Sequence, residues 1–195
     1  MSEFSAAILA GGRATRFGGR DKGSLIVDGR RIVDRQIAEL QQVAADLLVV
    51  GGTPCLELAG VRHVPDAILD SGPLGGLHAA LSEARGAATV VIACDMPYVT
   101  AALLRYLLTL TDNADVVVPR TERGYHPLSA AYTRACLDPI ARRLAARDLR
   151  VTGLFDDVKV RVVSREAVAA FGDPDRLLAN VNTPEEYRSI EASAS

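Results

Sequence analysis

The chain has 195 residues, of which 49% are hydrophobic and 24% charged, a composition typical of a globular protein long enough to bury one substantial core. Its formal net charge of −2 excludes the global basic field that would hold a nucleic-acid polymer or an anionic membrane. The apolar runs are shorter than a membrane span, and the first residues lack a leader pattern. We expect one cytoplasmic domain over residues 1–195, with its three widely separated cysteines reduced.

Short β-branched runs alternate with longer amphipathic stretches, which is typical of an α/β sandwich with a largely parallel sheet. The spacing predicts strands over residues 6–10, 47–50, 61–64, 89–93, 115–118, 128–132 and 159–163. It predicts helices over 32–43, from Pro73, over 100–110, over 134–146 and from Pro184. The strand over 89–93 carries no charge, so we expect it to lie at the centre of the sheet.

The segment over residues 9–23 follows the first predicted strand and contains five glycines, three arginines and one lysine. Glycines such as Gly11 and Gly12 let backbone N–H groups turn toward an anion, while Arg16 and Lys22 can neutralise its charge. Because α/β sheets bind ligands where strands pass into loops, we interpret this segment as a triphosphate-binding loop rather than a solvated turn. It fits neither the P-loop nor the dinucleotide pattern, so ATPase and dehydrogenase functions lose their main support.

Two adjacent glycines, Gly75 and Gly76, fall in the first turn of the helix expected from Pro73. Backbone N–H groups are unpaired there, and each glycine costs about 1 kcal/mol relative to alanine in a helix interior. The pair therefore suggests that a ligand approaches the backbone closely. Ordinary packing of the helix against the sheet is the alternative explanation.

An aspartate, Asp95, follows the uncharged strand over 89–93 almost directly. A carboxylate at the carboxyl end of a central strand lies beside the ligand crevice, and Mg²⁺ prefers one or two carboxylates together with phosphate oxygens. We therefore assign Asp95 as the Mg²⁺ ligand. The alternatives are a cap on the helix that begins near Thr100 or an Asx turn before Pro97.

Two segments in the second half of the chain also carry candidate polar residues. His126 precedes an apolar run, and Asn180 and Asn182 precede the last helix, whose cap is supplied by residues 183–186. The asparagines are therefore available to orient a substrate phosphate or a metal-bound water, and simple turn formation is an equal alternative.

Six motifs carry a resemblance that spans essentially the whole chain: Leu9-Ala10-Gly11-Gly12, Arg16-Phe17-Gly18-Gly19-Arg20-Asp21-Lys22, Gly72-Pro73-Leu74-Gly75-Gly76, Cys94-Asp95-Met96-Pro97, His126-Pro127-Leu128 and Asn180-Val181-Asn182-Thr183-Pro184. Together they resemble the molybdenum cofactor guanylyltransferases, a nucleotidyltransferase family that transfers GMP from GTP to molybdopterin. Other nucleotidyltransferases, including those acting on sugar phosphates, share the first loop and the strand-end aspartate. The His-Pro-Leu and Asn-Val-Asn-Thr-Pro segments better distinguish the molybdenum cofactor guanylyltransferases from those other nucleotidyltransferases.

The resemblance implies a three-layer fold with a Rossmann-like nucleotidyltransferase sheet. The nucleotide-binding residues that it implies are Leu9, Ala10, Gly11, Lys22, Asp66 and Asp95, with Asp66 near the nucleoside and Asp95 also on Mg²⁺. Lys22 and Arg16 would meet the charge of the triphosphate, and we place His126, Asn180 and Asn182 on the acceptor side. The implied partners are GTP and molybdenum-molybdopterin, with transient contacts to molybdoenzymes or their chaperones.

The chain departs from the family pattern at two places. Phe17 replaces a common methionine, and Gly51-Gly52 stands where some members have an asparagine near the nucleoside. The second departure leaves base selectivity open, so cytidylyl transfer to molybdopterin and nucleotidyl transfer to a sugar phosphate remain alternatives. A GTP-binding molybdopterin carrier is the non-enzyme alternative, although carriage alone would not need a metal at the α-phosphate.

Overall fold

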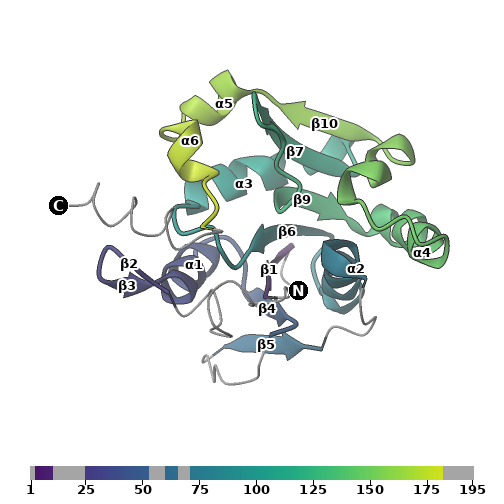
Figure 1. The fold of residues 1–195 in the computed structure, drawn as a ribbon, viewed down its shortest axis with the longest axis horizontal. Helices are drawn as coiled ribbons and strands as arrows, with labels where there is room; N and C mark the ends of the chain where they lie inside the picture. Colours follow the sequence, from purple (N-terminus) through teal and green to yellow (C-terminus); the bar gives the residue numbers. More distant parts are fainter. Residues whose placement is uncertain (1–2, 11–24, 53–59, 66–70, 182–195) are drawn as a thin grey trace.

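A mixed, mostly parallel sheet forms the centre of the molecule (Figure 1). The computed structural model describes residues 3–10, 25–52, 60–65 and 71–181. Within these residues the sheet has eight strands. In spatial order they are β10 (Val160–Val163), β7 (Val116–Thr121), β9 (Ser129–Thr133), β6 (Ala88–Ala93), β1 (Phe4–Leu9), β4 (Asp46–Val50) and β5 (Val61–Val64), with β8 (Gly124–Tyr125) paired to β7. All seven predicted strands are present.

The four strands that position the site, β5, β4, β1 and β6, are parallel to one another. In the register, Leu9 of β1 lies opposite both Val50 of β4 and Ala93 of β6, so these three strands end at the same level. Strand β6 is buried over its whole length, which confirms the central place expected for this uncharged run. Strand β9 runs antiparallel to both β6 and β7.

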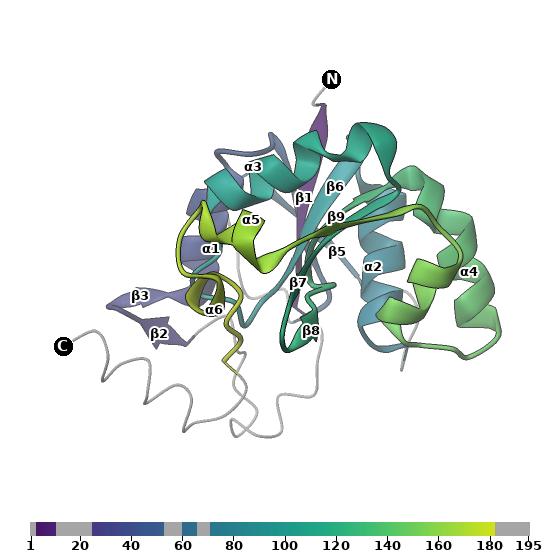
Figure 2. The same cartoon turned by 90° about the horizontal axis from the view of Figure 1, so that it is seen from above.

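Helices cover both faces of the sheet, as Figure 2 shows. The described helices are α1 (Ile32–Leu40), α2 (Gly72–Glu83), α3 (Ala101–Thr109), α4 (Leu137–Ala145), α5 (Arg165–Ala169) and α6 (Pro174–Leu177). Helices α1, α3, α5 and α6 pack on one face, and α2 and α4 pack on the other. The expected three-layer α/β/α architecture is therefore confirmed.

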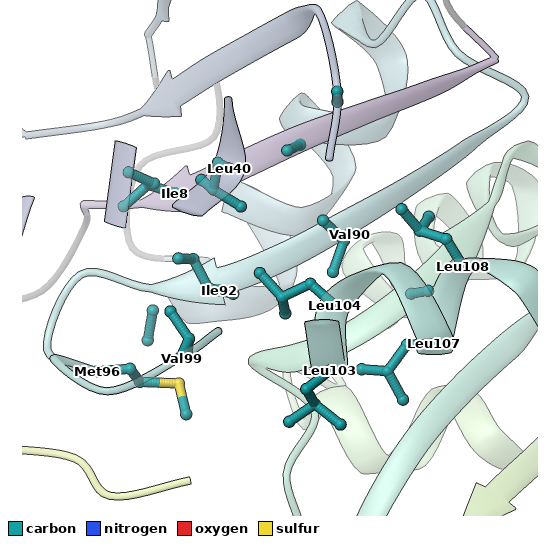
Figure 3. Close-up of a cluster of buried hydrophobic side chains, with 14 of the residues drawn as sticks. Ile8, Leu40, Val90, Ile92, Met96, Val99, Leu103, Leu104, Leu107 and Leu108 are labelled. Atoms are coloured by element: carbon teal, nitrogen blue, oxygen red, sulfur yellow. The ribbon is translucent and has the colours of Figure 1, made fainter. Parts of the chain in front are cut away.

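The core on the α3 face is built mainly of aliphatic side chains (Figure 3). Leu103, Leu104, Leu107 and Leu108 repeat at helical spacing along α3 and are fully buried. Each buried leucine contributes about 1.5 to 3 kcal/mol relative to an exposed one. Met96, which follows the strand β6, is 1% exposed and belongs to the same cluster. The core thus anchors the segment that carries Asp95.

Some short elements were not predicted from the sequence. One is a hairpin of β2 (Ile26–Val27) and β3 (Arg30–Arg31), joined by a turn at Asp28-Gly29 in which both residues have positive φ, as a tight hairpin turn requires. Three short 3₁₀ segments, η3 (Thr111–Asn113), η4 (Arg134–Cys136) and η5 (Val151–Asp156), complete the described elements. The helix expected from Pro184 lies outside the described residues. None of the described helices has the length and hydrophobicity needed to cross a membrane.

Candidate nucleotide and metal site

The carboxyl ends of β1, β4 and β6 bring three sequence-distant segments to one edge of the sheet. Ala10 donates its backbone N–H to the carbonyl of Val50 at 2.8 Å, and Cys94 donates to the carbonyl of Leu9 at 3.1 Å. These bonds extend the pairing of β1 with β4 and of β6 with β1 by one residue, to Ala10 and Cys94. Leu9 and Ala10, both expected to contact nucleotide, therefore adjoin the segment of Asp95, at the edge where parallel sheets bind ligands.

Asp95 lies in a tight turn directly after β6. The turn is closed by a bond from the Met96 N–H to the carbonyl of Ala93, with an N···O distance of 3.3 Å. The Asp95 residue is 8% exposed. The expected alternative, that Asp95 caps α3, is not what the structure shows: the cap is made by Thr100, whose hydroxyl accepts from Leu103, and by the carboxylate of Glu39, which accepts from the backbone of Ala101 at 2.6 Å.

The segment over residues 180–181 contacts Asp95 in two ways. Asn180 donates from Nδ2 to Oδ1 of Asp95 at 3.3 Å, and the backbone N–H of Val181 donates to the carbonyl oxygen of Asp95 at 2.8 Å. The Val181 side chain is fully buried against Val27 and Ile32. The structure thus brings together two candidates, Asp95 and Asn180, that are 85 residues apart in the sequence.

A further residue, Gln36, was missed by the sequence analysis. It lies on α1 among the buried residues Ile32, Val33, Ile37 and Leu40 and is itself fully buried. Its amide nitrogen donates to the carbonyl oxygens of Ala93 at 2.7 Å and Met96 at 3.0 Å. The signal that could have revealed it is a long polar residue inside an apolar helical stripe, since such a residue needs an internal partner.

Two glycines follow β4, and the second of them lies against Ala10, the residue after β1. Gly51 has φ of +72° and Gly52 has φ of +71°, a conformation that L side chains rarely adopt. A Cβ atom on Gly52 would lie 3.0 Å from the Cβ of Ala10. The backbone at Gly51 and Gly52, where this chain departs from the family pattern, thus has a conformation that favours glycine. Gly52 also lies beside Ala10, which we expect to contact the nucleotide.

Gly75 and Gly76 lie in the first half of α2, and both are buried. The expectation that their backbone N–H groups are unpaired is wrong for Gly75, which donates to the carbonyl of Ser71 at 3.4 Å because the helix already begins at Gly72. A Cβ on Gly76 would meet the two methyl carbons of Leu9 at 3.6 Å, which is ordinary van der Waals contact. At Gly76, then, the helix packs on β1 without requiring glycine for space.

His126 lies beyond the end of β6, in the segment that leads into β9. Leu128 accepts a backbone bond from Ala93 at 3.0 Å, and Nε2 of His126 is 2.9 Å from the hydroxyl of Thr121. Partial burial, and secondarily the positive charge of Arg123, lower the pKa of His126 below its usual value. The ring is therefore neutral at neutral pH, and the described contacts link it to Thr121.

Six of the candidate residues lie outside the described part of the chain: Gly11, Gly12, Arg16, Lys22, Asp66 and Asn182. Their roles remain those expected from the sequence. Leu25, at the start of the next described segment, accepts a backbone bond from Ile32 at 2.9 Å. This bond joins Leu25, which follows the predicted triphosphate loop in the sequence, to the first turn of α1.

The described part of the site suits a metal that is shared with its substrate. Within the described residues no three His, Cys, Asp or Glu side chains gather into a metal-binding group. Mg²⁺ commonly takes only one or two carboxylates and completes its shell with water and substrate phosphate oxygens. Asp95 at the strand edge, oriented by Asn180, fits that donor set.

Comparison with known proteins gives a consistent result. Residues 6–158 match the family model described as the MobA-like NTP transferase domain. A probable molybdenum cofactor guanylyltransferase of Pelotomaculum thermopropionicum is 38% identical over 94% of this chain and 90% of its own length. The molybdenum cofactor guanylyltransferase of Desulfosudis oleivorans is 34% identical over 99% of this chain and 96% of its own.

A solved structure shares the fold across nearly the whole chain. The molybdopterin-guanine dinucleotide biosynthesis protein A of Archaeoglobus fulgidus superposes with a TM-score of 0.82 and 21% identity, covering 97% of both chains. The resemblance seen in the sequence motifs is thus confirmed by sequence relatives and by fold. The chain belongs to the MobA-like NTP transferase family.

Proposed function

We propose that the chain transfers GMP from GTP to molybdenum-molybdopterin, producing the guanine dinucleotide form of the cofactor and pyrophosphate. Its family and the names of its relatives support this reaction. The observation that carries it is the bond between Asn180 and Asp95. It joins the strand-end carboxylate shared by many nucleotidyltransferases to the Asn-Val-Asn motif that discriminates the molybdopterin-specific ones.

The reaction does not require a protein side chain to form a covalent bond with the substrate. A phosphate oxygen of the acceptor attacks the α-phosphorus of GTP, and the bond from that phosphorus to the β-phosphate oxygen breaks, with pyrophosphate leaving. The attacking phosphate is already anionic near neutral pH, so no general base is required. Positioning and charge neutralisation then account for most of the catalysis.

Each candidate residue has a role in this scheme. Mg²⁺ bound at Asp95 would supply stabilisation of the negative charge on the phosphates. Arg16 and Lys22 meet the charge of the triphosphate. The remaining nucleotide contacts come from Leu9, Ala10, Gly11, Gly12, Asp66, Gly75 and Gly76. On the acceptor side we place His126, Asn180 and Asn182.

The proposal also includes the setting in which the enzyme works. Residues 1–195 would act as one domain in the cytoplasm, where GTP and the labile pterin are both present. Delivery of the product implies transient contacts with molybdoenzymes or their chaperones.

The direct test is pyrophosphate release from GTP with Mg²⁺ and freshly prepared molybdenum-molybdopterin. GTP should be used in preference to CTP and ATP at equal concentration. Preference for CTP would replace guanylyl by cytidylyl transfer, and turnover with sugar phosphates alone would move the acceptor to another class. GTP binding without any pyrophosphate release, with an acceptor of proven activity, would favour the carrier function instead.

Lys22 offers a matched pair of variants, because Lys159 is the only other lysine in the sequence. Lys22→Ala should weaken use of GTP without lowering thermal stability, since a phosphate-binding loop lysine acts through the ligand and not through the core. Lys159→Ala, at an exposed position, should leave both unchanged. Equal GTP kinetics in the two variants would contradict the phosphate role of Lys22.

A further inference from the structure

Gln36 is a fully buried amide on the apolar face of α1. Both of its described hydrogen bonds go to main-chain carbonyls, of Ala93 at 2.7 Å and of Met96 at 3.0 Å. Since both acceptors are carbonyl oxygens, the nitrogen of the amide must face them, because the reversed amide would place oxygen against oxygen. The chemistry of the partners therefore fixes the orientation of the Gln36 side chain.

The same orientation leaves the other end of the amide without a partner. Gln36 Oε1 is buried and has no hydrogen-bond partner among the described residues. A buried acceptor without a partner costs free energy that an apolar side chain of similar size would not. Helix packing alone would thus favour leucine or methionine at this position, and the amide indicates a role in holding its two partners.

Those two partners are the first and last residues of the turn that carries Asp95. The turn's own closing bond, from the Met96 N–H to the Ala93 carbonyl, is long at 3.3 Å. Gln36 bridges both ends of the turn with shorter bonds from one rigid helix. Cys94 and Asp95 occupy the two central positions, so a shift of either end would rotate the Asp95 carboxylate.

We propose that Gln36 is a positioning residue for Asp95, acting by holding the ends of its turn at a fixed separation. The inference rests on the proposed role of Asp95 as the metal ligand. The first residue of α1, Ile32, also donates its backbone N–H to the carbonyl of Leu25, the first described residue after the predicted triphosphate loop. Gln36 therefore links the turn of Asp95 to the helix that also contacts Leu25.

The variant Gln36→Met tests this role, because methionine keeps the length and apolar volume of the side chain but cannot donate. Gln42→Met is the matched control: Gln42 also donates its amide N–H to a backbone carbonyl, that of Ala38 at 3.0 Å, but from an exposed turn just after the end of α1. Mn²⁺ affinity is measured by electron paramagnetic resonance in the presence of the α,β-methylene analogue of GTP. Thermal unfolding is followed for each protein.

The expected result is a Mn²⁺ affinity about 10- to 100-fold weaker in Gln36→Met, the range usual when a residue that orients a metal ligand is lost. The Mg²⁺ concentration for half-maximal turnover should rise, while the KM for GTP at saturating Mg²⁺ changes little. Gln42→Met should match the wild type. Unchanged Mn²⁺ affinity in folded Gln36→Met, whatever its melting temperature, would overturn the inference, because a merely structural role would alter stability alone.

If Gln36→Met does not fold, Gln36→Asn carries the same test, since its amide is one methylene too short to reach both carbonyls. The Mn²⁺ measurement does not depend on turnover or on the acceptor. Failure of guanylyl transfer in the wild type would contradict the proposed function, but the Mn²⁺ affinities of the Gln36 variants could still be compared with that of the wild type. Normal transfer with identical Mn²⁺ affinity in all variants would remove the positioning role and leave the function intact.

Discussion

Asn180 donates its side-chain N–H to Oδ1 of Asp95 at 3.3 Å, across 85 residues of sequence. The next residue, Val181, donates its backbone N–H to the Asp95 carbonyl at 2.8 Å. The amide of Asn180 thus reaches the carboxylate while the neighbouring backbone holds the main chain of the same residue. The segment before the last predicted helix therefore contacts Asp95 through both its side chain and its backbone.

Asn180→Ala removes the side-chain bond and should leave the backbone bond in place. We expect turnover to fall about 10- to 100-fold and the Mg²⁺ requirement to rise, as is usual when an orienting partner of a metal ligand is lost. Steady-state kinetics over a range of Mg²⁺ concentrations measures both effects. Asn113→Ala, at an exposed position of η3, is the control. Wild-type Mg²⁺ dependence in Asn180→Ala would show that the bond has no role in catalysis.

Asp95→Asn keeps the shape of the side chain and removes its charge. Metal-dependent turnover should fall by about a thousandfold or more, because the charge stabilisation that a bound metal supplies is worth several kcal/mol. Circular dichroism should report an intact fold, and Asp112→Asn on the exposed surface of η3 should retain full activity. A normally active Asp95→Asn protein would refute the assignment.

The sheet was predictable from sequence because its buried strands are uncharged or nearly so. Strand β5 has the predicted bounds, and β6 begins only one residue before its predicted start. Helices α5 and α6 were missed because each has only four or five residues, too few for a helical period to show. Short elements of this kind are held by tertiary contacts, such as the ion pair from Arg165 to Asp175 at 2.9 Å.

The site was predictable only as separate residues. Asp95 was predicted because a carboxylate directly after an apolar strand is a signal within a few residues of sequence. Asn180 was predicted because the cap of the helix that follows it does not require an asparagine there. Their pairing was not found, since a side-chain contact between distant segments leaves no period or spacing in the sequence. Gln36 was missed for a related reason: its partners are backbone carbonyls, which carry no sequence signal of their own.

His126 gives an expected pH dependence of stability. Its pKa in the folded protein is lowered, first by burial and then by Arg123, with Asp175 acting in the opposite direction. The unfolded chain, with a histidine pKa of about 6.5, therefore binds the proton more readily. The stabilisation is present above that pH and is lost as pH falls toward the folded pKa. Urea unfolding from pH 7.5 to 5 should show a flatter pH dependence for His126→Gln than for the wild type. Equal slopes for His126→Gln and the wild type would contradict the lowered pKa of His126.

Gly76→Ala separates the two explanations for the glycines in α2. The added methyl group would meet Leu9 at an ordinary 3.6 Å, and alanine is favoured over glycine in a helix by about 1 kcal/mol. The free energy of unfolding should therefore be unchanged or higher. GTP affinity, measured by calorimetry, should fall by roughly tenfold if the triphosphate approaches the backbone there, equivalent to about 1.4 kcal/mol. Unchanged affinity would assign Gly76 to helix packing alone.

Gly52→Ala tests the close approach of the chain after β4 to Ala10. Two costs combine: a positive φ of +71° and a Cβ placed 3.0 Å from the Ala10 Cβ. The first is about 1 to 2 kcal/mol for an L residue, and overpacking adds about 1 to 3 kcal/mol. Gly60→Ala is the matched control, because Gly60 has φ of +80° but nothing within 4 Å of an added Cβ.

In urea unfolding, the free energy of unfolding should therefore fall more for Gly52→Ala than for Gly60→Ala. The difference between the two losses measures the cost of the close contact with Ala10. Because Ala10 is expected to contact nucleotide, Gly52→Ala should also weaken GTP binding, whereas Gly60→Ala should not. Equal losses of stability in the two variants would mean that only backbone strain matters. Equal GTP affinity would mean that the Gly51-Gly52 segment does not shape the nucleotide site, and base selectivity would then have to come from elsewhere.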